Sequence, residues 1–129
     1  MQKRILLIDD DKDDAELFVD ALQEIAIDAS FDHYSDGIEA LAKLAEPDIP
    51  QPGVIFLDIN MPVIDGWECL RRIKQAARLR DIPIVMYSTA NLQERGVTPG
   101  DVGAAAFLIK PGNFADLKLR LAELLGRLF

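Results

Sequence analysis

Residues 5–11 read ILLIDDD, four apolar residues followed directly by three aspartates. An apolar run of this length is too short for a helix and is typical of a parallel strand buried on both faces. The pattern returns at residues 54–58, VIFLD, where the run again ends in an aspartate. Two buried strands that both end in acid predict an α/β sheet with carboxylates at one edge.

The rest of the chain alternates between the same two kinds of segment. Strands are expected at residues 5–8, 28–34, 54–57, 84–87 and 106–109, the second of them at an edge of the sheet. Apolar residues at helical spacing predict helices at residues 13–25, 37–45, 66–77 and 113–127. Strands that alternate with helices in this way predict a five-stranded parallel sheet with helices on both faces.

One segment interrupts the alternation. Residues 92–100, between the fourth and fifth strands, read LQERGVTPG. Gly96, Pro99 and Gly100 all disfavour the interior of a helix. We therefore predict a short or irregular fourth helix.

Length and charge restrict the class of protein. The 129 residues are about the size of one domain, so we expect a single domain over residues 1–129 with no effector domain. The net charge of −8 argues against partners that are nucleic acids or anionic membranes. The single cysteine, Cys69, allows no internal disulfide. The start of the chain is unlike a signal peptide, and no apolar run approaches a membrane span, so a cytoplasmic protein is expected.

Polar residues follow four of the predicted strands: Asp9-Asp10-Asp11, Asp58, Ser88 and Lys110. Ligands of open α/β sheets bind at the carboxyl ends of the strands, so these side chains are expected in one cleft. Clustered carboxylates repel one another, and Mg²⁺ is a hard cation that relieves this repulsion with oxygen ligands. One carboxylate of such a site could attack phosphorus and form an acyl phosphate, while a lysine and a hydroxyl stabilise the phosphoryl charge.

These residues lie within four motifs whose order is informative. An apolar strand precedes Asp9-Asp10, and D-x-N-M-P-x-x-D-G runs from Asp58 to Gly66. P-x-x-x-x-S then runs from Pro83 to Ser88, and G-A-x-x-F-x-x-K-P from Gly103 to Pro111. In this order the motifs make the chain similar to the receiver domain of two-component response regulators, of the single-domain type found in chemotaxis. The resemblance implies a flavodoxin-like (β/α)5 fold with strand order 2-1-3-4-5.

The resemblance also implies a role for individual residues. Asp58 would be the phosphoacceptor, and Ser88 and Lys110 would contact phosphoryl oxygens. Mg²⁺ would be bound by Asp9, Asp10, Asp58 and the backbone carbonyl of Asn60. Phe107 is at the position of a switch aromatic, although a plain core phenylalanine is an equal alternative. The family usually has a cis peptide at the position of Lys110-Pro111.

Partners follow from the same resemblance. The phosphoryl group would come from a sensor histidine kinase or a histidine phosphotransfer protein. Transfer to and loss from the aspartate would be self-catalysed, so the chain is expected to be a signalling domain and not an enzyme. Output would be contact with a downstream protein target, from a monomer or weak homodimer.

A phosphatase of the haloacid dehalogenase type is the main alternative. That family uses an aspartate after its first strand as the nucleophile, which would be Asp9, with Asp11 completing its D-x-D motif. Ser88 and Lys110 resemble its second and third motifs. Against this alternative, position 13 is Asp where Thr or Val is expected, and no acidic pair follows Lys110.

Other polar residues have ordinary structural explanations. Acids at the start of a helix usually cap it or face solvent, which is the expectation for Asp11, Asp13 and Asp14. Asp65 is the expected N-cap of the third long helix. His33, the only histidine, is expected to be a surface or hydrogen-bonded side chain and not a phosphodonor.

Overall fold

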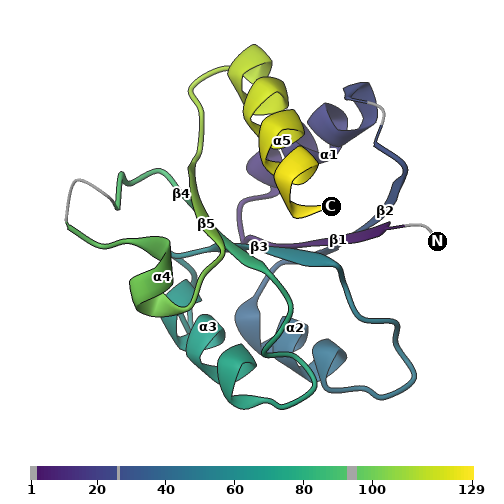
Figure 1. The fold of residues 1–129 in the computed structure, drawn as a ribbon, viewed down its shortest axis with the longest axis vertical. Coiled ribbons are helices and arrows are strands. Elements are labelled where there is room, and N and C mark those ends of the chain that lie inside the picture. The colour runs from purple at the N-terminus through teal and green to yellow at the C-terminus, as the bar shows by residue number, and fades with distance from the viewer. Residues whose placement is uncertain (1–2, 26, 93–95) are drawn as a thin grey trace.

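Five parallel strands form one sheet in the order β2-β1-β3-β4-β5, which confirms the predicted fold (Figure 1). The computed structural model describes residues 3–25, 27–92 and 96–129. The strands are β1 (Lys3–Ile8), β2 (Ala29–Tyr34), β3 (Val54–Asp58), β4 (Ile84–Ser88) and β5 (Ala106–Ile109). Every residue of β3 and β4 is buried, as expected of strands covered on both faces, whereas β2 is half-exposed at the sheet edge.

The register of the strands fixes where each one ends. Asp58 pairs with Tyr87, and Ser88 pairs with Ile109. Ile8, the last residue of β1, pairs with Leu57, so Asp9 follows at the level of Asp58. The carboxyl ends of the strands therefore place the predicted polar residues along one edge of the sheet.

Four long helices connect or follow the strands. They are α1 (Lys12–Glu24), α2 (Gly37–Leu44), α3 (Gly66–Gln75) and α5 (Phe114–Leu128). Each begins after an Asp or Asn whose side chain accepts a backbone N–H of the first turn, a cap that contributes about 1 kcal/mol. The caps are Asp11, Asp36, Asp65 and Asn113, so the predictions for Asp11 and Asp65 are confirmed. No helix of the described residues is long and apolar enough to cross a bilayer.

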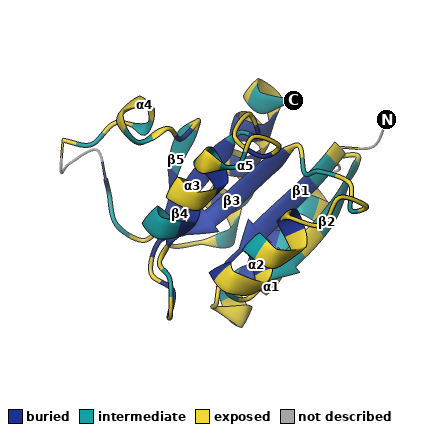
Figure 2. Cartoon of the chain, turned by 90° about the horizontal axis from the view of Figure 1, so that it is seen from below, coloured by how far each residue is buried: buried dark blue, intermediate teal, exposed yellow. Residues whose placement is uncertain are grey.

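The sheet separates two apolar clusters. Helices α1 and α5 cover one face, where Phe18 packs edge-to-face against Phe56 and Tyr87. Helices α2 and α3 cover the other face, where Leu57 and Met86 are buried (Figure 1). The helices present exposed residues outward and the central strands are buried along their length (Figure 2).

The fourth helix is short, as predicted. In residues 99–102, α4 (Pro99–Val102) makes one turn and none of its residues is buried. It ends at Gly103, whose φ of 80° lies in the left-handed region that suits glycine. Residues 93–95 of the segment used for this prediction lie outside the described residues.

The prediction of a cis peptide bond at Lys110-Pro111 is wrong. Among the described residues no peptide bond is cis. A bond before proline favours the trans form by about 0.5–1 kcal/mol, and trans is what this chain adopts.

Val63 stores backbone strain in the loop between β3 and α3. Its φ is 69° and 88% of its surface is exposed, so a β-branched residue occupies the left-handed region without packing that requires it. Val63→Gly is expected to raise the free energy of unfolding by about 0.5–1 kcal/mol. Urea denaturation measures this difference. Val63→Ala, which keeps the Cβ, is the control and should gain less; a Gly variant no more stable than wild type would contradict the argument.

Candidate functional site

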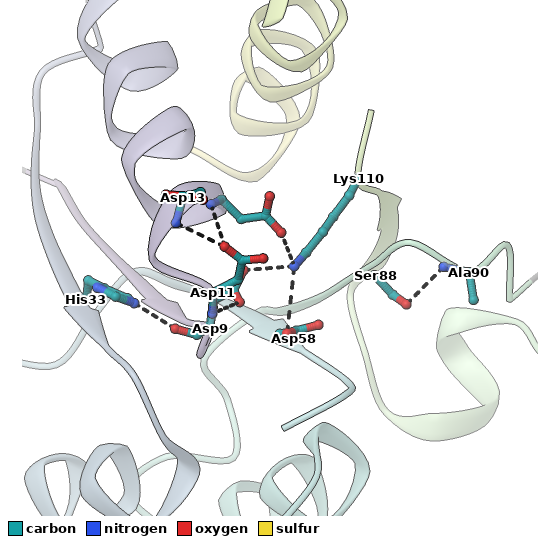
Figure 3. A network of polar contacts seen from close by, with 9 residues as sticks. Asp9, Asp11, Asp13, His33, Asp58, Ser88, Ala90 and Lys110 are labelled. Atoms are coloured by element: carbon teal, nitrogen blue, oxygen red, sulfur yellow. Dashed lines mark hydrogen bonds and ion pairs between the residues drawn. The ribbon is translucent and has the colours of Figure 1, made fainter. Parts of the chain in front are cut away.

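Four strands contribute polar side chains to one edge of the sheet (Figure 3). Asp9 follows β1, Asp58 ends β3, Ser88 ends β4 and Lys110 follows β5. The backbone N–H of Lys110 donates to the carbonyl oxygen of Ser88 at 2.7 Å, which ties the ends of β4 and β5 together. The structure thus brings these residues to one place, as the sequence predicted.

Three carboxylates form the acidic part of the site. One oxygen from each of Asp9, Asp10 and Asp58 lies within 4.8 Å of the other two. Asp9 is fully buried and Asp58 is 6% exposed, while Asp10 is exposed to solvent. An all-oxygen set open on one side fits a hard divalent cation that retains water ligands. Asn60, the other predicted ligand, is exposed two residues beyond Asp58.

The environment of Asp58 disfavours its negative charge. Burial is the main cause, and the nearby charge of Asp9 adds to it, so that the pKa of Asp58 rises from 3.8 to about 7. The Lys110 ammonium acts in the opposite direction but does not cancel these effects. Without a bound cation, Asp58 therefore changes its charge near neutral pH.

Lys110 is the cation of the site, and its side chain is only 10% exposed. Its Nζ lies 2.9 Å from Oδ2 of Asp9, 2.8 Å from Oδ2 of Asp14 and 3.7 Å from Oδ2 of Asp58. Burial alone would lower the pKa of Lys110, but hydrogen bonds to Asp14 and Asp9 raise it above its usual value. The ammonium also lies 5.1 Å from the centre of the Tyr87 ring. Lys110 thus stays charged at physiological pH.

Asp9 is held on every side. Its Oδ1 accepts the Asp11 N–H at 2.9 Å, and its Oδ2 accepts from Lys110. Its backbone carbonyl accepts from Nε2 of half-buried His33 at 2.8 Å (Figure 3). His33 is therefore a hydrogen-bonded side chain, as predicted, and it fixes the backbone beside the site.

Ser88 is buried but its hydroxyl does not face the carboxylates in this conformation. Oγ accepts the backbone N–H of Ala90 at 3.1 Å, and Figure 3 shows it turned toward Ala90 and away from Asp58. Phe107 is half-buried, beside a hollow of about 380 Å³ that Leu92 and Ile109 also line. A rearrangement of this region would therefore break the hydrogen bond between Ala90 and Ser88, and Phe107 has open space beside it.

Glycine at position 66 brings α3 against the site. A Cβ on Gly66 would overlap with the carbonyl oxygen of Asp58. Its N–H donates to the carbonyl oxygen of Ile59 at 2.8 Å. The close approach of α3 therefore holds the backbone of Asp58 in place, and no larger residue permits it.

Asp14 is the site residue that sequence reasoning missed. We expected it to cap α1 or face solvent, but its Oδ2 is the nearest acceptor to the Lys110 ammonium. Its position in the sequence gave a signal, because Asp14 is one helical turn before Phe18, which is fully buried. A residue on that side of α1 lies toward the sheet, and the Asp14 side chain is accordingly only 33% exposed.

Comparisons with known proteins agree on one family. The model of the response regulator receiver domain matches residues 5–122. The response regulator Rcp1 of Synechocystis sp. is 34% identical over 119 residues, which cover 89% of this chain and 81% of Rcp1. The two-component response regulator ARR15 of Arabidopsis thaliana is 37% identical over 107 residues, which cover 83% of this chain and 46% of ARR15.

Solved structures show the same likeness. The Mn²⁺-bound form of response regulator Rcp1 superposes with a TM-score of 0.82 at 32% identity, covering 95% of this chain and 91% of that one. The chemotaxis protein CheY4 of Vibrio cholerae superposes with a TM-score of 0.81 at 28% identity and covers both chains completely. These relatives give no support to the phosphatase alternative.

Proposed function

Because the chain belongs to the response regulator receiver domain family, we propose that Asp58 accepts a phosphoryl group from a phosphohistidine. The observation that carries this proposal is the arrangement of three carboxylates and one buried ammonium at the carboxyl edge of the sheet. The donor would be a sensor histidine kinase or a histidine phosphotransfer protein. As in other receiver domains, the role is signalling and not turnover of a substrate.

Asp58 is the nucleophile of the proposed transfer. An oxygen of its ionised carboxylate attacks phosphorus, so a P–O bond forms as the P–N bond of the phosphohistidine breaks. The electron pair of the broken bond stays on the departing imidazole nitrogen. Asp58 suits this role because it is 6% exposed yet lies beside both acidic neighbours and Lys110.

Mg²⁺ is the cation that the site would hold, through Asp9, Asp10, Asp58 and the backbone carbonyl of Asn60. When bound it would supply positive charge that lets the carboxylates coexist with a phosphoryl group. Lys110 would bind one phosphoryl oxygen, and its Nζ is already 3.7 Å from Asp58. Ser88 would donate to another after its hydroxyl leaves the Ala90 N–H.

Output would pass through protein contact. Movement of Ser88 would change the loop after β4, and Phe107 would turn inward beside the hollow that it lines. The downstream partner is then a protein that distinguishes the two states of this face. We further propose that the protein is cytoplasmic and acts as a monomer or weak homodimer.

Incubation with acetyl phosphate and Mg²⁺ tests the proposal. Intact mass is expected to show one added phosphoryl group, and borohydride reduction followed by peptide mapping should place it on Asp58. Chelation of Mg²⁺ should prevent the gain. A label on Asp9 would instead support the phosphatase alternative, and no label at all would contradict phosphoryl acceptance.

A further inference from the structure

The Lys110 ammonium has more carboxylate neighbours than it binds. An ammonium has three N–H donors, and here two of them go to Asp9 at 2.9 Å and Asp14 at 2.8 Å. Asp58 lies 3.7 Å from Nζ, beyond hydrogen-bond distance. In this state the lysine donates hydrogen bonds to Asp9 and Asp14, whereas its contact with the proposed phosphoacceptor is a longer ion pair without a hydrogen bond.

Asp14 accepts one of these two hydrogen bonds and is not one of the three clustered carboxylates Asp9, Asp10 and Asp58. It lies on α1 in the first turn, where its backbone N–H is capped by Oδ1 of Asp11 at 3.1 Å. The next residue, Ala15, is buried, so the backbone of this turn is fixed against the core. The three carboxylates that could share a cation are Asp9, Asp10 and Asp58, and Asp14 is not among them. Its carboxylate thus has Lys110 as its partner and no evident metal role.

We propose that Asp14 is a positioning residue that holds Lys110 away from Asp58 in the unphosphorylated protein and gives the lysine up when a phosphoryl group arrives. This inference rests on the proposed function. It has two consequences of opposite sign. Holding the ammonium aside keeps Asp58 available to Mg²⁺, because a lysine on Asp58 would compete with the metal for that carboxylate. It also makes phosphorylation harder, because Nζ must move from Asp14 toward Asp58 before its third N–H can reach a phosphoryl oxygen.

Asp14→Asn tests both consequences, with Asp13→Asn as the matched control. Asp13 is the adjacent acid of the same turn and is exposed, so its loss removes the same charge without touching Lys110. In the Mg²⁺-free Asp14→Asn protein, Nζ of Lys110 is expected within hydrogen-bond distance of Asp58. A crystal structure and the ¹⁵N signal of the Lys110 ammonium report this position.

Two further measurements compare the variants. By calorimetry, Asp14→Asn is expected to bind Mg²⁺ about three- to tenfold more weakly than Asp13→Asn. At saturating Mg²⁺ it is expected to react with acetyl phosphate about three- to tenfold faster. Loss of charge alone changes these values without moving Lys110, and simple damage to the fold predicts that both quantities fall. Either result, or an unmoved Lys110, overturns the proposal.

The wild-type protein provides a second test that needs no variant. In its complex with Mg²⁺ and beryllium fluoride, a phosphoryl mimic, Lys110 should contact fluoride and leave Asp14. Retention of the Asp14 contact there would also overturn the inference. The Mg²⁺-free position of Lys110 does not depend on phosphorylation, so it can stand even if Asp58 accepts no phosphoryl group.

Discussion

Asp58→Asn is expected to abolish phosphoryl acceptance and, in Mg²⁺-free buffer at pH 8, to make the protein more stable. The amide oxygen is too weak a nucleophile to form an acyl phosphate. The same change removes a buried negative charge beside Asp9 and Asp10, which wild type must tolerate when no cation is bound. Loss of function and gain of stability should therefore occur in one variant.

The pH dependence follows from the pKa of Asp58, which is raised from 3.8 to about 7. The folded protein binds this proton more tightly than the unfolded chain, so the contribution of Asp58 to stability falls as pH rises from about 4 to about 7. Asparagine has no such dependence. The variant should equal wild type near pH 4 and exceed it by about 2–4 kcal/mol above pH 7.

Urea denaturation at several pH values in the presence of a chelator measures this difference. Added Mg²⁺ should narrow it, because the cation stabilises the wild-type site more than a site that lacks one carboxylate. Intact mass after treatment with acetyl phosphate measures phosphoryl acceptance. Equal stability of the two proteins at pH 8 without Mg²⁺ would contradict the raised pKa of Asp58.

Lys110→Met is expected to have the opposite effect on stability. Methionine fills a similar volume but leaves Asp9, Asp14 and Asp58 without their ammonium partner. Removing one member of a buried ion pair costs about 3–5 kcal/mol, and Asp9 is fully buried. The loss should be largest at pH 8 and smaller at pH 5, where protonation of Asp58, whose pKa is raised to about 7, relieves the repulsion. Thermal and urea unfolding in chelator measure it.

Lys118→Met is the control for this prediction. Lys118 pairs with Glu24 at 3.1 Å, but the two side chains are 32% and 55% exposed. A surface pair of this kind contributes about 0–1 kcal/mol. Mg²⁺ should rescue Lys110→Met and leave Lys118→Met unchanged, since only the first variant has an uncompensated acidic pocket. Similar losses of stability in both variants would contradict the prediction that the buried carboxylates depend on the Lys110 ammonium.

The sequence predicted the strands well because buried strands consist of short, continuous apolar runs. The apolar runs that end at Asp9 and Asp58 have no polar face to turn toward solvent, so they belong in the centre of a sheet. Strand ends then located Lys110 as well, since parallel strands end at a common edge. Helix starts were predicted from Asp11 and Asp65, whose side chains cap locally and depend on no distant contact.

Long-range choices of partner were harder to predict. The acids of α1 look alike in sequence, yet Asp11 caps the helix while Asp14 reaches Lys110, which is 96 residues away. Only the packing of α1 beside α5 on one face of the sheet, which brings Asp14 to Lys110, decides between these roles. The direction of the Ser88 hydroxyl was equally hard to predict, because a local hydrogen bond from the Ala90 N–H competes with contacts to the site. The roles of Asp58, Asn60 and Phe107 stay predictions until they are measured.

The sheet that separates the two apolar clusters has an evolutionary consequence. Tyr87 faces the α1–α5 cluster while its neighbour Met86 faces the α2–α3 cluster, so adjacent residues of one strand belong to different cores. Substitutions in clusters that share few contacts add in their effects on stability. Each face can therefore change its packing without repacking the other, although both draw on the same free energy of unfolding, and a lineage can alter one partner surface while it keeps the opposite one.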